Sequence, residues 1–225
     1  MTANGVQCDQ LVRVLSAKKP ALSLNLRNSK LTKNSFDYLA RTLVNPEFYL
    51  TALNLKFCFI SFEQAMQLAN ILRHNKTLVK LDLSNNGLKS CVVHYLLESI
   101  TPNQYLSEVN FSGNFLDDDF ARDLSHVLKE NGVLNKVDIS ENPIGPEGAK
   151  LLFNALCEDN DTLTDLGDLS VRSAAMGVRI REELRQVLTL NSSSHDKKKA
   201  FIEQLMHQTR TKNADSSKTA ENEKA

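Results

Sequence analysis

The sequence has little of several things that would point to a particular chemistry. It contains no Trp, and aromatic residues make up 6% of its 225 residues, so any core must consist mainly of Leu, Ile, Val and Ala. Lys plus Arg and Asp plus Glu each number 27, which makes the formal net charge zero. A balanced charge gives no overall attraction to nucleic acid, and we expect no nucleic-acid partner.

Cysteine pairs and long apolar runs are also absent. The four cysteines lie far apart in the sequence with no CxxC spacing, which predicts free thiols in a reducing compartment. The first twenty residues lack an apolar run typical of a signal peptide, and no later stretch is long enough to span a bilayer. We therefore expect a cytoplasmic protein without membrane insertion.

No combination of residues typical of an enzyme or a metal site is present. Cys91 and His94 are spaced like half of a metal site, but no second pair of ligands accompanies them. The run Asp117–Asp119 is better explained as the acidic first turn of a helix, and Pro146 as the first residue of another. We expect no catalytic residues, no cofactor, no metal and no small-molecule substrate.

What the sequence does contain is a repeat. The pattern apolar-x-apolar-x-x-Asn-x-apolar recurs with starts 28 or 29 residues apart. Its five copies are LNLRNSKL from Leu24, LNLKFCFI from Leu53, LDLSNNGL from Leu81, VNFSGNFL from Val109 and VDISENPI from Val137. A degenerate sixth copy starts at Leu166.

The second half of each unit changes to the helical period of 3.6 residues. The predicted buried stripes are Phe36, Leu39 and Leu43; Ala65, Leu68, Ile71 and Leu72; Val93, Leu96 and Ile100; Ala121, Leu124, Val127 and Leu128; and Ala149, Leu152, Ala155 and Leu156. Each unit is therefore predicted to be a short strand, a turn, a helix and a return loop.

These units resemble leucine-rich repeats of the long, ribonuclease-inhibitor type. The resemblance implies an α/β solenoid, a right-handed β-α superhelix with a parallel sheet on the concave side and helices on the convex side. We expect five full repeats over residues 21–163 and a divergent capping repeat over residues 164–190. Residues 1–20 would form a capping helix or a half-repeat, and the alternative that the chain is part of a longer array stays open.

One position in each turn is expected to face inward and to satisfy backbone groups that the turn leaves unpaired. This position holds Ser29 in the first unit. In the last unit it holds Val171, whose side chain cannot form such bonds. The structural ladder is predicted to consist of Cys58, Asn86, Asn114 and Asn142.

The concave face is the candidate binding surface for a protein partner. Alternation along each strand predicts that Ser84, Ser112 and Ser140 point outward together with polar residues earlier in the strands. The candidate partner-binding residues are Arg27, Asn54, Lys56, Lys80, Asp82, Glu108, Asn110, Lys136 and Asp138. Phe57 and Phe59 are the best candidates for an apolar anchor.

After the repeats, residues 191–212 are predicted to form a basic amphipathic helical tail, and residues 213–225 to be disordered. Its apolar stripe consists of Phe201, Ile202, Leu205 and Met206. Two interpretations of the stripe remain open: the helix packs on the last repeat, or it docks on a partner.

The expected function is a non-catalytic scaffold or adaptor that binds another protein. Resemblance to small repeat proteins of the cytoskeleton and cilium implies a role in such an assembly. Two alternatives share this repeat type, a GTPase-activating protein of the Ran type and actin pointed-end capping of the tropomodulin type. The former carry a strongly acidic tail, whereas this tail has seven Lys or Arg against five Asp or Glu from Asn191 onward.

Overall fold

The computed structural model describes residues 23–45, 48–158, 160–167, 178–191 and 196–205. Within them, strands and helices alternate as the repeat predicts. The units are β1 (Ser23–Asn25) and α2 (Lys33–Val44), β2 (Ala52–Asn54) and α3 (Phe62–His74), β3 (Lys80–Asp82) and α4 (Ser90–Ile100), β4 (Glu108–Asn110) and α5 (Asp118–Glu130), and β5 (Lys136–Asp138) and α6 (Pro146–Glu158). Helix α7 (Val178–Asn191) and a helical segment at residues 196–205 follow.

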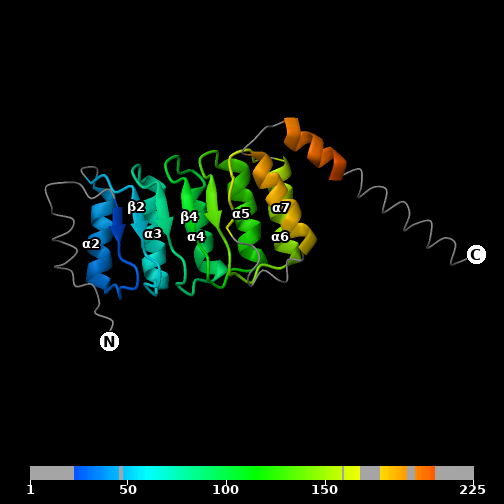
Figure 1. Cartoon of the computed structure of the whole chain (residues 1–225). Coiled ribbons are helices and arrows are strands. Elements are labelled where there is room, and N and C mark those ends of the chain that lie inside the picture. Colours follow the sequence, from blue (N-terminus) through cyan, green and yellow to red (C-terminus); the bar gives the residue numbers. More distant parts are fainter. Residues whose placement is uncertain (1–22, 46–47, 159, 168–177, 192–195, 206–225) are drawn as a thin grey trace, which may run out of the picture.

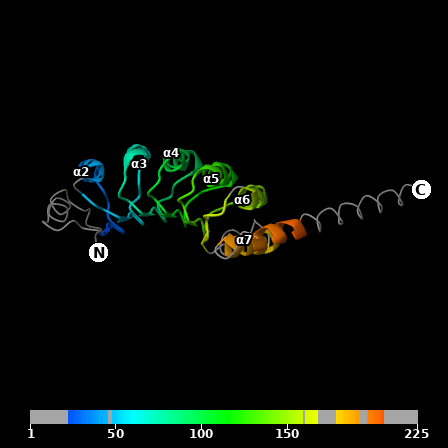
Figure 2. The same ribbon diagram turned by 90° about the horizontal axis from the view of Figure 1, so that it is seen from above.

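The five strands form one parallel sheet in sequence order, from β1 to β5. Equivalent residues of successive repeats pair directly, so that Leu53 lies beside Leu81 and Leu81 beside Val109. The helices stand side by side in Figure 1, and Figure 2 shows α2 to α6 on the outer side of an arc with the strands on its inner side. The predicted parallel α/β solenoid is thus confirmed.

The core lies between the sheet and the helices and runs without a break through the repeats. The middle residue of every strand points into it, and all of these residues are buried: Leu24, Leu53, Leu81, Val109 and Val137. Each helix from α2 to α6 adds its predicted stripe, such as Leu124 and Leu128 in α5. Burying one such side chain is worth about 1.5–3 kcal/mol, and stacking supplies burial that a single repeat lacks.

The inward asparagines bind the turns of neighbouring repeats to one another. Asn114 Oδ1 accepts hydrogen bonds from the backbone N–H groups of Asn86 and Leu88 in the preceding turn, both at 3.0 Å. Its Nδ2 donates to the carbonyls of Leu83 and Phe111, at 3.2 and 2.7 Å. Asn86 and Asn142 repeat this arrangement. In the second unit the thiol of Cys58 donates to the Leu26 carbonyl at 3.0 Å.

A second row of buried asparagines closes the opposite end of the repeats. The side-chain Nδ2 of each donates to a carbonyl at the end of the preceding helix, as from Asn75 to Leu43 at 2.7 Å and from Asn131 to Ile100 at 2.9 Å. Each Oδ1 accepts N–H groups two and three residues further on. The row consists of Asn75, Asn103, Asn131 and Asn160.

Helix starts follow the predicted local chemistry. Asp117 caps α5 by accepting the N–H of Asp119, and two acidic residues occupy the first turn of that helix. Pro146 is the first residue of α6, where its missing N–H has no consequence. Both assignments agree with the sequence prediction.

Beyond β5 the described part of the sheet continues only as a single parallel bridge between Lys136 and Asp165. The expected N-terminal helix, Val171 and the expected disordered end lie outside the described residues, so the proposed domain boundaries stay a prediction. Among the described helices, none is both long and apolar enough to cross a membrane.

Candidate protein-binding surface

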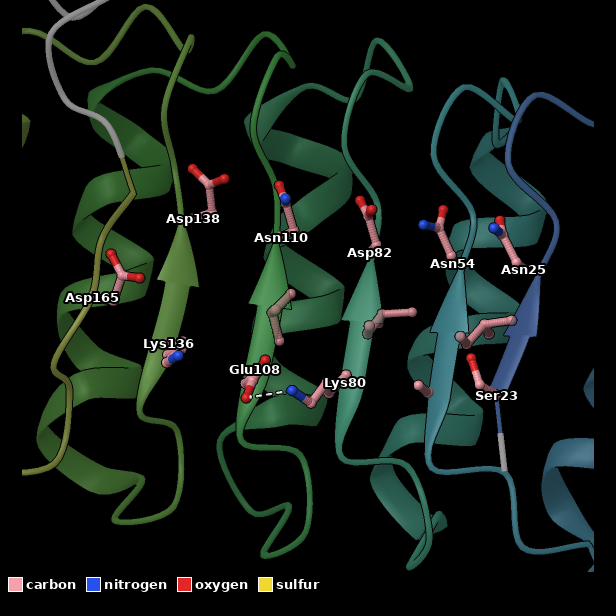
Figure 3. A pocket seen from close by; sticks show the side chains of 14 residues that line it. Ser23, Asn25, Asn54, Lys80, Asp82, Glu108, Asn110, Lys136, Asp138 and Asp165 are labelled. Carbon is pink, nitrogen blue, oxygen red and sulfur yellow. Dashed lines mark ion pairs between the residues drawn. The ribbon is translucent and has the colours of Figure 1, made fainter. Parts of the chain in front are cut away.

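The strand register arranges the side chains of the concave face in two rows (Figure 3). The charged row holds the first residue of each strand and the residue bridged to β5: Ser23, Ala52, Lys80, Glu108, Lys136 and Asp165. The amide–carboxylate row holds the third residue of each strand: Asn25, Asn54, Asp82, Asn110 and Asp138. Both rows line an open groove of about 400 Å³.

The charged row alternates in sign along its second half. Lys80 Nζ lies 2.9 Å from Glu108 Oε1, and the exposed Lys136 follows between Glu108 and Asp165. Ion pairs between exposed groups contribute only about 0–1 kcal/mol, so a partner can replace this one at little cost. The row therefore offers an alternating charge pattern rather than a field of one sign.

The amide–carboxylate row is held in place by the turns. Oδ1 of each residue accepts the N–H two positions further on, as from Lys56 to Asn54 at 2.9 Å and from Ser112 to Asn110 at 2.8 Å. Asn25, Asp82 and Asp138 do the same. This bond fixes the side chain and leaves its second polar atom for a partner, an amide donor in Asn and a carboxylate oxygen in Asp.

The prediction that three serines face outward is wrong. Ser84 is 0% exposed, and Ser112 and Ser140 are also buried. Each strand ends two residues before its serine, so period-two alternation no longer applies. The hydroxyl of Ser84 donates to Asp82 Oδ1 at 2.6 Å, which makes Asp82 a structural residue as well as a surface one.

Arg27 and Lys56 lie two residues past the ends of β1 and β2, and neither lines the groove. Both approach the ring of Phe57, with Arg27 Cζ 5.9 Å and Lys56 Nζ 5.5 Å from its centroid. Phe59 is 75% exposed, in keeping with the expectation that one of the two phenylalanines lies at the surface. These residues form a cationic and aromatic group at the β1–β2 end of the face.

The tail segment at residues 196–205 packs on the last unit of the solenoid. Lys198 is 4% exposed, and its Nζ donates to the Asn160 carbonyl at 2.6 Å and to Asp161 Oδ1 at 2.7 Å. Phe201 contacts the core, and Ile202 and Leu205 are half-buried. Met206 lies outside the described residues. A role for this stripe in partner binding stays a proposal.

Some features of the site were missed in the sequence. Asp165 joins the charged row, but the degenerate sixth motif concealed its register. Lys198 is one of three consecutive lysines in the sequence, and only its contacts with the distant Asn160 and Asp161 explain its burial. Among the described residues no group of His, Cys, Asp or Glu is placed to hold a metal ion. His94 Nδ1 instead lies 2.8 Å from Asp123 Oδ2.

Comparisons with known sequences agree with this architecture. A family model described as Leucine Rich repeat matches residues 74–90 and 131–153. The chain is 34% identical over 161 residues to "NACHT, LRR and PYD domains-containing protein 4E" of Mus musculus, a match that covers 71% of the chain and 16% of that protein. It is 28% identical over 167 residues to the ribonuclease inhibitor of Mus musculus, covering 74% of the chain and 36% of the inhibitor. The chain thus spans only part of these relatives.

Two solved structures share the fold. The tropomodulin C-terminal domain of Caenorhabditis elegans superimposes with a TM-score of 0.60 at 17% identity, covering 70% of this chain and 93% of that one. The structure of leiomodin-1 actin-binding site 2 gives a TM-score of 0.55 at 17% identity, and the match covers 93% of this chain and 95% of that one. At this identity the likeness concerns the fold alone. Repeat period, sheet, ladder and relatives together show that the chain is a leucine-rich repeat protein of the ribonuclease-inhibitor type.

Proposed function

We propose that this chain is a non-catalytic scaffold that binds another protein in the groove of its concave sheet. The observation that carries the proposal is the pair of parallel rows, whose side chains the strands and turns already hold in place. A preformed surface loses little conformational entropy on binding, so spaced polar contacts suffice for useful affinity.

The alternating charges suit a partner whose own charges alternate with the opposite sign. Such complementarity contributes to specificity and to the rate of association more than to affinity. The groove itself lacks the aromatic and arginine anchors of the tightest interfaces. We therefore expect an interaction of moderate affinity that weakens as salt concentration rises.

Affinity capture from cells with two matched charge reversals tests the proposal. Lys136→Glu reverses the charge of an exposed residue in the charged row. Lys150→Glu makes the same charge reversal at an exposed residue of α6, on the convex side, and serves as the control. We expect the first variant to lose at least about tenfold of the captured partner, since like charges across an interface cost several kcal/mol. Equal loss from both variants, or loss from Lys150→Glu alone, would contradict the concave site.

We further propose that the partner belongs to a cytoskeletal assembly. The support is the likeness in fold to tropomodulin and to a fragment of leiomodin-1 described as an actin-binding site, the latter covering 93% of this chain. A cytoplasmic location would follow from this role, and a ciliary one is a narrower form of the same proposal.

Actin capping of the tropomodulin type is the second candidate, favoured by the same two structures. Elongation of pyrene-labelled actin from free pointed ends measures it directly. Slower elongation with the wild-type chain, and restored elongation with Lys136→Glu, would assign actin to the concave groove. Unchanged elongation at micromolar chain would exclude capping and leave the scaffold proposal standing.

A further inference from the structure

The turns after the strands present one exposed residue per repeat at the same position. In the first five units these residues are Lys30, Phe59, Gly87, Phe115 and Pro143. Two are phenylalanines, with Phe59 75% and Phe115 59% exposed. Their rings add little to the core, so packing within the chain does not explain why large apolar residues stand there.

The backbone around Phe59 is also unfavourable. Phe57 and Phe59 have φ angles of 56° and 53°, and the position of Phe57 has a positive φ in every repeat, at Asn28, Asn85, Gly113 and Glu141 as well. The left-handed conformation costs a non-glycine residue roughly 1–2 kcal/mol. The conformation of Phe57 is therefore common to the repeats, whereas Phe59 bears this cost at a position where the next repeat has Gly87 with φ 70°. A strained residue that exposes an aromatic ring is in keeping with a binding site.

Gly87 is the exposed residue of the repeat that lies between those of Phe59 and Phe115. A Cβ at Gly87 would lie 3.7 Å from Phe115 Cε2, so the ring of Phe115 extends over the glycine turn. Phe59 and Phe115 are two repeats apart, about 9.5 Å at the spacing of neighbouring strands.

Two positive charges lie beside the ring of Phe57, two residues before Phe59. Arg27 and Lys56 lie against the Phe57 ring, and in the described parts of the chain no carboxylate pairs with either. Lys80, one strand further on, does pair with Glu108. Arg is among the residue types that carry most binding energy in protein interfaces, and Phe is enriched there.

We propose that these turns, named here the aromatic rim (Arg27, Lys56, Phe57, Phe59, Gly87 and Phe115), dock an acidic segment of a partner protein that carries an apolar side chain. The apolar side chain packs between Phe59 and Phe115, and the carboxylates pair with Arg27 and Lys56. This inference rests on the proposed function as a protein scaffold. The zero net charge of the chain disfavours a nucleic-acid strand at the same place.

Fluorescence polarisation with short labelled peptides tests the rim. The probe is a Glu-rich peptide with one central Leu, compared with a version containing Lys for Glu and a version containing Ser for Leu. Phe59→Asn keeps a residue that tolerates the left-handed conformation, so the turn stays folded while the ring is lost. Tyr105→Ala is the matched control, because Tyr105 is an exposed aromatic residue in the loop between α4 and β4.

We expect the Glu-rich peptide to bind at least about tenfold more weakly to Phe59→Asn, and to Arg27→Glu with Lys56→Glu, while Tyr105→Ala binds like wild type. The Ser version should bind weakly and the Lys version not at all. No binding of the Glu-rich peptide at millimolar concentration, equal binding by a folded Phe59→Asn, or tighter binding of single-stranded oligothymidine would overturn the proposal.

Partner capture separates this inference from the proposed function. Loss of the partner with Lys136→Glu but not with Phe59→Asn would retain the concave groove and overturn the rim. The reverse result would retain the rim and overturn the groove.

Discussion

Replacing Asn114 with Ala should destabilise the solenoid severely, although the side chain is small and polar. Asn114 is 1% exposed, and its Oδ1 is the acceptor for the N–H groups of Asn86 and Leu88. The carbonyls that its Nδ2 reaches each keep another donor, since Asn86 also donates to Leu83 and Asn142 to Phe111. The lasting loss is therefore two buried N–H groups without an acceptor.

Each buried donor left without a partner costs about 1–3 kcal/mol, so the free energy of unfolding should fall by roughly 2–6 kcal/mol. Domains of this size are stable by only about 5–15 kcal/mol, so the change is a large share of the total. Asn110→Ala is the matched control. Asn110 is half-buried, and its Oδ1 accepts from the N–H and hydroxyl of Ser112 at the sheet surface, where water can replace it.

Urea unfolding followed by circular dichroism measures both variants, and amide exchange locates the damage. We expect the exchange rates of Asn86 and Leu88 to rise most in Asn114→Ala, and Asn110→Ala to lose about 1 kcal/mol. A loss in Asn114→Ala below about 1 kcal/mol, or one equal to that of Asn110→Ala, would refute the structural role assigned to the ladder.

Three further predictions concern single groups. The hydrogen bond to Asp123 raises the pKa of His94. This bond therefore stabilises the fold at low pH, and its stabilisation is lost as the pH rises through the pKa of His94 in the folded chain. Between about pH 5.5 and pH 8, the melting temperature of Asp123→Asn should therefore fall less than that of the wild type. Burial raises the pKa of Cys157 to about 11, so iodoacetamide at neutral pH should modify exposed Cys91 well before Cys157, and equal rates by mass spectrometry would contradict the burial. Lys198→Met removes two hydrogen bonds, so amide exchange in the last helical segment should accelerate at least about tenfold, and unchanged exchange would mean that the tail is held by other contacts.

The repeat made most of the fold predictable, because strand, turn and helix each leave a periodic signal. Leu81 in a strand and Leu124 in a helix are both buried, as the periods of two and of 3.6 residues in the sequence predict. The serines were misplaced because the strands are only three residues long, and alternation beyond Asp82 describes a turn rather than a strand. Strand length depends on how neighbouring repeats pair, which the local pattern does not contain.

The second asparagine row was missed although its signal was present. Asn75, Asn103, Asn131 and Asn160 recur with the period of the repeat, but asparagine near a helix end is also common for local reasons. Their bonds to the preceding helix connect residues about thirty positions apart, such as the 32 between Asn75 and Leu43. The contact of Lys198 with Asn160 spans 38 positions. Such contacts follow from the stacking of repeats, so they become visible only once the solenoid is assembled.

Site-specific photocrosslinking in cells tests the central claim, binding in the concave groove, most directly. A photoreactive phenylalanine analogue at Ala52 would place the label in the groove, and the same residue at the exposed His126 of α5 would place it on the convex side. The account predicts a discrete covalent adduct with a partner protein from position 52 and none from position 126. An adduct from position 126 alone, or equal adducts from both, would contradict binding in the groove.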